Sequence, residues 1–389
     1  MNASEPTPHA LYIHWPWCRK KCPYCDFNSH VNQGAPAEDY LAALLREMET
    51  SAQTVAPGRL VSVFFGGGTP SLMAPEYVAA LVDKAHDLFG FAPDIEITLE
   101  ANPTSAEAAK FQAFAAAGVN RFSIGMQSPE AADLAFLGRE HSADEATDAV
   151  KDALKATPNV SLDLIYGLPN QDLDTWQANL KGLALLGTPH ISCYQLTIEK
   201  NTRFYADMNK GRLTPAPDDA QATFYHETNT VLTEAGFEQY EVSNYARGGA
   251  VCHHNKHIWQ YGSYIGIGAG AHGRTRQGAG TLLATRNYKM PEKYIDMVRQ
   301  NGHGHYEAQP IEAEEQATEA LLLGLRLAEG LPLERLEALT GNPWHTHLEK
   351  DGIALMATNG LLVPEVDTTL KATPQGLAML EGVLGYIVK

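Results

Sequence analysis

Hydrophobic and polar positions along the first 215 residues alternate between two periods. Short runs rich in β-branched and aromatic residues predict strands, and the amphipathic stretches between them are long enough for helices. The predicted strands are Ala10–His14, Leu60–Phe65, Ile95–Glu100, Arg121–Met126, Val160–Ile165 and His190–Ile198. The predicted helices are Glu38–Glu49, Pro75–Leu88, Ser105–Ala117, Ala143–Ala156 and Asp172–Leu186.

This alternation is typical of parallel βαβ units. Six strands in about 190 residues fit a curved sheet or incomplete barrel better than a closed eight-fold barrel, which needs ~250 residues. We therefore predict an α/β fold containing a partial (β/α)6 barrel. Ligands bind at the carboxyl ends of the strands in such sheets, so the site residues should directly follow strands.

After residue 215 the alternation weakens. Pro215–Asp219 has the composition of a linker, a helix is predicted over Ala220–Ala235, and a region rich in glycine and histidine runs from Gly248 to Gly273. Helices dominate after Pro310, with one short strand, and the predicted elements are Ala313–Ala328, Leu333–Leu339, His345–Thr358, Leu361–Pro364 (the strand) and Pro374–Leu384. We expect four parts: an N-terminal tail (1–11), the partial barrel (12–215), an extension (216–309) and a mostly helical, winged-helix-like C-terminal domain (310–389).

Composition and charge narrow the classes of partner. The 389 residues are 44% apolar and 19% charged, which is ordinary for a globular protein. Basic residues number 29 against 46 acidic ones, giving a net charge of −17, so a nucleic-acid partner is not expected because it needs basic residues at the phosphates. We see no signal peptide and no apolar run long enough for a membrane span, and we expect a cytoplasmic protein.

Three of the five cysteines, Cys18, Cys22 and Cys25, lie within eight residues directly after the first predicted strand. A structural zinc ion needs a fourth ligand, for which His14 and His30 are near enough in sequence. A [4Fe–4S] cluster held by three cysteines instead leaves one iron open. The amino and carboxylate groups of S-adenosylmethionine can chelate that iron, and an electron from the cluster can then cleave the sulfonium.

The CX3CX2C spacing after a first β-strand resembles the signature of the radical-SAM superfamily. The resemblance implies a [4Fe–4S] cluster on the three cysteines and S-adenosylmethionine (SAM) as a second cofactor. It also implies SAM contacts from Tyr12, Tyr24, Gly67, Gly68, Thr69, Glu100, Gln127, Arg139 and Asp163. The resemblance implies that Tyr24 lies against the adenine and that the Gly67–Thr69 turn contacts the methionine amino group, and a carboxylate at Glu100 could bind ribose hydroxyls. Without the resemblance, the turn and Glu100 are also typical of an ordinary loop and a solvated strand end.

Longer strings resemble one branch of this superfamily, the HemN/HemW group, over most of the chain. They are Tyr12–His14, Phe65–Ser71, Asp163–Pro169, Tyr194–Glu199 and Tyr264–His272. The resemblance implies one of two functions. One is oxygen-independent coproporphyrinogen III dehydrogenase, which decarboxylates two propionates of its substrate. The other is a HemW-type haem chaperone.

Three features favour the chaperone. Phe27 stands where the dehydrogenases have a fourth cysteine (CX3CX2CXC). Only 11 residues precede Tyr12, whereas the dehydrogenases have a longer N-terminal extension that reaches over the active site. Residues 254–259 read HNKHIW and resemble the HNXXYW haem-binding motif of HemW proteins, with Ile258 in place of the tyrosine. We therefore expect His254 to contribute to haem binding, although a loop histidine with ordinary hydrogen bonds is the simpler interpretation.

The expected protein carries haem as cargo and delivers it to haem-dependent proteins such as respiratory enzymes, after receiving it from a donor protein. It acts as a monomer or as a SAM-dependent dimer. Cys252, His253 and His257 are further candidate haem ligands, whereas Cys193 is expected in the core. A radical-SAM enzyme that modifies RNA or a peptide is disfavoured by the net acidity.

Overall fold

The computed structural model describes residues 7–31, 36–278, 280–364 and 368–389. The first six residues of the predicted tail lie outside the described residues. Residues 7–11 are not a tail, because they already belong to strand β1 (Thr7–Trp15), in which Thr7 pairs with Gly58 of β4 (Gly58–Gly67). The strand therefore begins three residues earlier than its hydrophobic pattern indicated.

One large mixed sheet organises the fold, in the order β14-β13-β12-β11-β1-β4-β5-β6-β7-β8-β10-β9. All six predicted strands are present and mutually parallel: β1, β4, β5 (Phe91–Ala101), β6 (Arg121–Gln127), β7 (Val160–Tyr166) and β8 (His190–Gln195). The last of these ends three residues before the prediction. The two ends of the sheet are not paired with each other, so the barrel is partial, as predicted.

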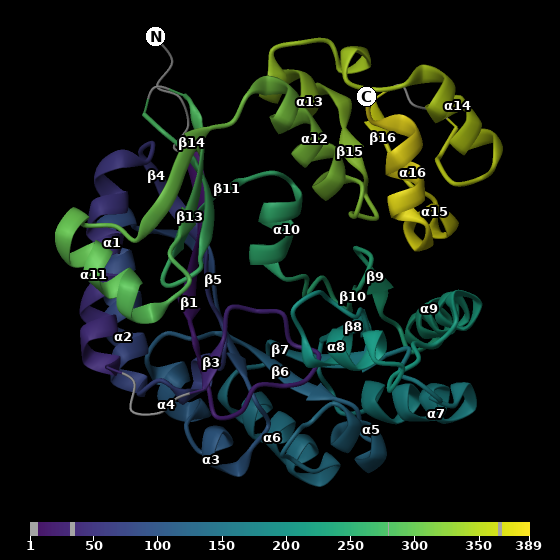
Figure 1. The fold of residues 1–389 in the computed structure, drawn as a ribbon, viewed down its shortest axis with the longest axis horizontal. Helices are drawn as coiled ribbons and strands as arrows, with labels where there is room; N and C mark the ends of the chain where they lie inside the picture. The colour runs from purple at the N-terminus through teal and green to yellow at the C-terminus, as the bar shows by residue number, and fades with distance from the viewer. Residues whose placement is uncertain (1–6, 32–35, 279, 365–367) are drawn as a thin grey trace.

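Helices cover the outer face of the parallel strands (Figure 1). They are α1 (Ala37–Thr54), α2 (Pro75–Phe89), α3 (Ser105–Ala108), α4 (Phe111–Ala116), α5 (Ala131–Phe136), α6 (Ala143–Ala156) and α7 (Leu173–Ala184). The single helix predicted over 105–117 is divided between α3 and α4. The break lies beside Lys110, whose ammonium donates to the carbonyls of Ser71 (3.0 Å) and Met73 (3.3 Å).

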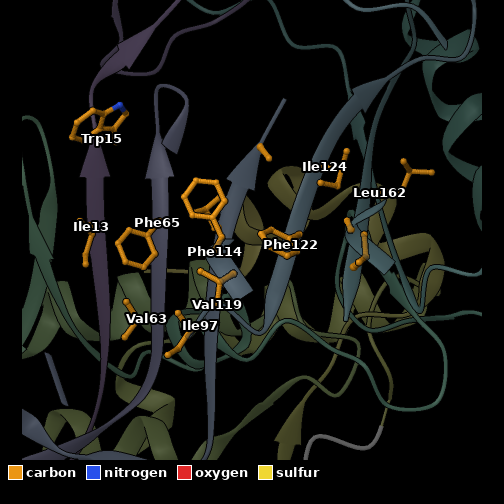
Figure 2. Packing of buried hydrophobic residues seen from close by; sticks show 14 of the residues in the cluster. Ile13, Trp15, Val63, Phe65, Ile97, Phe114, Val119, Phe122, Ile124 and Leu162 are labelled. Carbon is orange, nitrogen blue, oxygen red and sulfur yellow. The ribbon is translucent and has the colours of Figure 1, made fainter. Parts of the chain in front are cut away.

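Period-two alternation decides which side chains reach the barrel interior. Figure 2 shows Ile13, Val63, Phe65, Ile97, Phe122 and Ile124 along neighbouring strands, packed together with Phe114 and Val119. The intervening positions face the other way, and many of them are polar, such as Ser123 and Asp163. The apolar side therefore packs against the helices, and the polar side is left for a ligand.

The chain does not leave the sheet at residue 215. After α8 (Arg203–Asn209) and α9 (Asp218–Glu234), β9 (Glu238–Gln239) and β10 (Asn244–Ala246) extend the sheet beyond β8. After α10 (His253–Trp259), β11 (Ser263–Ile267) pairs parallel to β1 at the other edge of the sheet. The antiparallel strands β12 (His272–Arg276), β13 (Leu282–Asn287) and β14 (His305–Pro310) then follow, with α11 (Pro291–Asn301) between β13 and β14. The pattern predicted none of these strands: β9 and β10 are only two and three residues long, β11 and β12 each contain a glycine, and β14 is mostly exposed.

The C-terminal residues form a helical unit with its own hydrophobic cluster, to which Tyr261 and Leu282 of the extension also belong. Its helices are α12 (Ala313–Gly324), α13 (Leu333–Thr340), α14 (Lys350–Thr358), α15 (Pro374–Ala378) and α16 (Leu380–Ile387). The strand predicted at 361–364 is wrong, since Leu362 forms only an isolated bridge to Ala372. The two-stranded sheet consists of β15 (Leu331–Pro332) and β16 (Thr369–Leu370).

Three helix limits in this unit also differ from the predictions. The first helix ends at Gly324, the segment from His345 is a 3-10 turn before α14, and the last predicted helix is divided at Met379. The domain boundaries at 215 and 309 stay predictions. In the described part of the chain, no helix is long and apolar enough to cross a membrane.

Candidate functional site

A cavity of about 830 Å³ opens at the carboxyl ends of the parallel strands and continues into the barrel. Its wall contains the three predicted cluster cysteines, the predicted SAM residues and His254: Tyr12, Cys18, Cys22, Tyr24, Cys25, Gly67, Gly68, Thr69, Glu100, Gln127, Arg139, Asp163 and His254. These residues come from seven different segments of the chain. The structure therefore brings the predicted cluster and SAM residues and His254 into one space, and their individual roles stay predictions. The further haem candidates Cys252, His253 and His257 are not among its lining residues.

The three cysteines lie in the loop that follows β1, and each thiol is free and partly exposed. Thr69 Oγ1 donates to Cys18 Sγ at 3.5 Å, and Arg139 Nη1 donates to Cys22 Sγ at the same distance. Burial raises the pKa of the Cys18 and Cys25 thiols, and hydrogen bonds from Thr69 to Cys18 and from the Phe27 amide to Cys25 oppose that rise. Donors aimed at sulfur are a recognised part of iron–sulfur sites.

The residues present fit a three-cysteine cluster better than a zinc ion. His14, a candidate fourth zinc ligand, is already occupied, because its Nδ1 is 2.9 Å from the Tyr12 hydroxyl and its Nε2 is 2.8 Å from the Asn28 carbonyl. Among the described residues, no three His, Cys, Asp or Glu side chains converge on a single-ion site. The cysteines of an iron–sulfur cluster bind different irons, so they need not converge on one point.

Two backbone amides of the glycine turn after β4 are bonded to the segment that leads into the cysteine loop, and the SAM contact of the turn stays a prediction. The Gly68 amide donates to the Trp15 carbonyl (2.7 Å) and the Thr69 amide to the Trp17 carbonyl (2.9 Å). A Cβ at Gly68 would lie 2.7 Å from the Trp17 oxygen, so only glycine allows this approach. The turn therefore anchors the start of the cysteine loop. A ligand amino group is itself a donor, so it would use acceptors here rather than these amides.

Two carboxyl groups, Glu100 and Asp163, lie in the cavity wall. Glu100 accepts from the Gly67 amide (3.2 Å), and its burial together with the negative charge of Asp163 raises its pKa to about 8. Asp163 accepts from the hydroxyls of Ser123 (2.6 Å) and Ser161 (2.9 Å). A protonated Glu100 can both donate to and accept from ligand hydroxyls, which suits the predicted ribose contact.

Two of the predicted SAM residues show local strain or packing that fixes their position. Gln127 ends β6 with a φ of +69°, a left-handed conformation that non-glycine residues rarely adopt. Tyr24 packs near Phe204, with 6.4 Å between the ring centroids. Each side chain is therefore held at the cavity wall by its backbone or its neighbours.

Two arginines, Arg139 and Arg121, line the cavity. Arg139, one of the predicted SAM residues, already uses both Nη groups: Nη1 donates to Cys22, and Nη2 donates to the side-chain oxygen of Asn102 and to the Gly125 carbonyl. The sequence analysis missed Arg121, which also lines the cavity although it is only 2% exposed. A charged residue at a predicted strand start is usually solvated, so the sequence held no signal for its burial.

His254 lies at the inner end of the cavity, on α10. Its Nδ1 shares a hydrogen bond with the Ser62 hydroxyl (2.9 Å), and its ring stacks on Phe64 with centroids 4.8 Å apart. Burial, with the positive potentials of His257 and Arg121, lowers its pKa to about 3, so the imidazole is neutral. The helix itself is held by Glu96, whose carboxylate accepts from the backbone amide of His254 (3.1 Å).

The other candidate haem ligands differ in position. His253 is exposed, and His257 Nε2 is bonded to the Ser263 carbonyl (2.9 Å). Cys252 is fully buried and points at Glu96 (3.6 Å), and Cys193 is buried in β8 as predicted. Phe27, at the position of the missing fourth cysteine, lies at the cavity rim with 59% of its surface exposed.

Comparisons with known proteins add to this geometry. Residues 12–181 match the model of the Radical SAM superfamily, and residues 311–379 match the HemN C-terminal domain. The chain is 40% identical to "Radical S-adenosyl methionine domain-containing protein 1, mitochondrial" of Bos taurus over 96% of this chain and 86% of that protein. It is also 40% identical to "Heme chaperone HemW" of Escherichia coli (strain K12), over 86% of each chain.

Among solved structures, the fold is similar to coproporphyrinogen III oxidase (HemN) from Escherichia coli. The TM-score is 0.81, over 98% of this chain and 90% of that one. The two sequences are 21% identical, so this likeness concerns the fold alone.

Proposed function

The chain belongs to the HemW family of the radical-SAM superfamily, and on this premise we propose that it is a haem chaperone, which binds haem and delivers it to haem-dependent proteins. The observation that carries the proposal is the position of His254. This histidine of the HNXXYW-like segment lies in the wall of the same cavity as the three cysteines. The recipients we propose are haem enzymes such as those of respiration, and the compartment is the cytoplasm.

The state of His254 supports a ligand role. Its Nδ1 is held by Ser62, and in the described part of the chain its Nε2 makes no hydrogen bond. A metal-binding histidine commonly has its second ring nitrogen fixed in this way, which orients the ring. The lowered pKa keeps the imidazole neutral, which is the form that binds iron.

The cofactor residues follow from the same cavity. We propose that Cys18, Cys22 and Cys25 hold a [4Fe–4S] cluster and that SAM lies beside it. When bound, the cluster supplies an open iron and an electron for the SAM sulfonium. Thr69 and Arg139 donate to the cysteine sulfurs, Tyr24 offers a flat wall for a base, and Glu100 faces the ligand hydroxyls.

The test of function compares carrier with enzyme in anaerobically purified protein. We expect stoichiometric haem binding in a Soret titration. We also expect no protoporphyrinogen IX from coproporphyrinogen III, with SAM and a strong reductant, above a no-enzyme control. Robust formation of protoporphyrinogen IX would overturn the proposal in favour of the dehydrogenase.

Variants on one helix separate the haem site from the cluster. His254→Ala should weaken haem binding, whereas His253→Ala, which changes its exposed neighbour, should bind haem like the wild type. Both should retain the visible absorption of the cluster. The cluster absorption should disappear in the variant with Cys18, Cys22 and Cys25 changed to alanine and persist in Cys193→Ala. Wild-type haem affinity in His254→Ala would show that His254 is not the haem ligand.

A further inference from the structure

Arg121 is a buried cation at the inner part of the cavity with no role in the site described so far. It is the first residue of β6 and pairs in register with Thr98, whereas Ser123, two residues on, pairs with Glu100. Arg121 therefore lies one inward-facing position deeper than the Glu100 level. Its side chain is 2% exposed and forms part of the cavity wall.

The N–H groups of the Arg121 guanidinium make no hydrogen bond to the described residues. Within the described residues, its buried Nε has no hydrogen-bond partner, and the whole group donates no hydrogen bond. The carboxylate nearest to it, Glu96, is 3.9 Å from Nε, beyond hydrogen-bonding distance. Glu96 instead accepts from the amides of His253 (3.0 Å) and His254 (3.1 Å). A buried charged donor without an acceptor costs desolvation free energy, so a bound ligand with an acceptor would stabilise it.

The remaining charged groups of the cavity do not supply that acceptor. Asp163 already accepts from Ser123 and Ser161, and Glu100 accepts from Gly67. The other cavity arginine, Arg139, has both Nη groups bonded to protein atoms. The Nε of Arg139 is also buried without a partner among the described residues, so the two arginines differ in their Nη groups. Those of Arg121 donate to no described protein atom and face a space large enough for a ligand.

We propose that Arg121 binds a carboxylate of the cavity's ligand, namely a propionate of haem. This assignment rests on the proposed haem-carrier function. The planar guanidinium matches a carboxylate with two parallel hydrogen bonds, and burial strengthens that pair. SAM also has a carboxylate, but its predicted place is at the cysteine end. Gln127, at that end of β6, is six residues from Arg121, or about 20 Å along the strand. A propionate extends from the edge of the macrocycle and can reach the deeper position.

The experiment titrates haem, haem dimethyl ester and SAM separately into the anaerobically purified, cluster-loaded protein. Removing Arg121 alone would leave Glu96 as a buried uncompensated charge, so the main variant is Arg121→Gln combined with Glu96→Gln. Arg121→Lys keeps the charge and removes the two-pronged geometry. Controls are Glu96→Gln alone and Arg46→Gln, an arginine on α1 that bonds to the Val298 carbonyl outside the cavity. Circular dichroism and cluster absorbance check that each variant is folded.

The wild type should bind haem about 10- to 100-fold more tightly than the dimethyl ester, the range expected for one charged hydrogen-bonded pair. The double variant should lose that preference while binding the ester and SAM as tightly as Glu96→Gln alone does, and the preference of Arg121→Lys should lie between those of the wild type and the double variant. Equal affinity of the wild type for haem and its ester, or an unchanged preference in the double variant, would overturn the Arg121 assignment alone. A selective loss of SAM affinity would instead assign Arg121 to the SAM carboxylate. A wild type that binds neither haem nor the ester would reject the haem-carrier function itself.

Discussion

Glu100 is a carboxyl group whose surroundings oppose its ionisation. It lies in the cavity wall near the end of β5, and burial followed by the charge of Asp163 raises its pKa to about 8, although the Gly67 amide favours the charged form. The unfolded chain has an ordinary glutamate pKa. The folded state therefore holds a proton that the unfolded state releases between these two values, so this group's contribution to stability is present below the unfolded pKa and is lost as pH rises through about 8.

Glu100→Gln should therefore stabilise the ligand-free protein increasingly as pH rises. Relative to the wild type, the gain in the free energy of unfolding should be small near about pH 5, grow up to about pH 8 and then level off. Urea unfolding of cluster-free protein at several pH values measures it. Glu76→Gln, at an exposed position of α2, is the control and should show no such growth. A pH-independent difference for Glu100→Gln would contradict this account.

At the scale of elements, one buried carboxylate joins the barrel to the extension. Glu47 of α1 accepts from the amides of Gly268 (2.9 Å) and Gly304 (2.8 Å), the Tyr294 hydroxyl (2.7 Å) and the Asn287 side-chain amide (3.0 Å). These donors come from the end of β11, the region around α11, and β13. Burial raises the pKa of Glu47, and the four donors oppose that rise. The network thereby fixes the edge strands against the first barrel helix.

Glu47→Ala should destabilise the fold by about 3 kcal/mol or more, because several buried donors lose their acceptor at once. Glu47→Gln should cost less, since its oxygen retains some of the bonds. Glu49→Ala is the matched control, because Glu49 lies on the same helix, is half exposed and forms an ion pair with Lys84. The free energy of unfolding should fall by less than about 1 kcal/mol in Glu49→Ala. Similar destabilisation by the two alanine variants, in urea unfolding, would show that the network carries no special weight.

At the scale of the whole molecule, α10 lies between the barrel and the C-terminal unit, close to β4 on one side and α12 on the other (Figure 1). Ion pairs join the two sides. Arg274 Nη2 lies 2.6 Å from Glu319 Oε1, and the Tyr261 hydroxyl donates to Glu319 Oε2 (2.8 Å). Lys256 of α10 pairs with Glu329 (2.8 Å). The helix that carries His254 is therefore held from both sides.

A double-mutant cycle on Arg274→Gln and Glu319→Gln should give a coupling energy of about 1–2 kcal/mol, because the pair is partly shielded from solvent and shares a tyrosine. Urea unfolding of the wild type, both single variants and the double variant yields the coupling. The exposed pair Lys151 and Asp148 of α6 is the reference and should give about 0.5 kcal/mol or less. Equal couplings for the two pairs would mean that the domain contact gains nothing from this ion pair.

The sequence by itself determined the local features of this protein. Six parallel strands follow from their apolar runs, and α6 spans the predicted Ala143–Ala156 because Ser142 and Glu145 form a capping box at its start. The cysteine spacing placed three thiols in one loop after β1. Strand ends meet at one edge of a parallel sheet, so the predicted site residues lie in one cavity. Each of these features depends on residues close together in the chain or on a general rule of sheet geometry.

Only the tertiary structure decided which groups are buried and what they touch. Among the described residues, Arg121 donates to no acceptor, whereas both Nη groups of Arg139 are bonded to protein atoms. Glu47 accepts from residues more than 200 positions away. The extension supplies strands to both edges of the sheet although its own pattern is weak. These outcomes depend on contacts between segments that are distant in the chain. The surrounding partners determine whether a polar group can be buried, and a single segment carries no information about those partners.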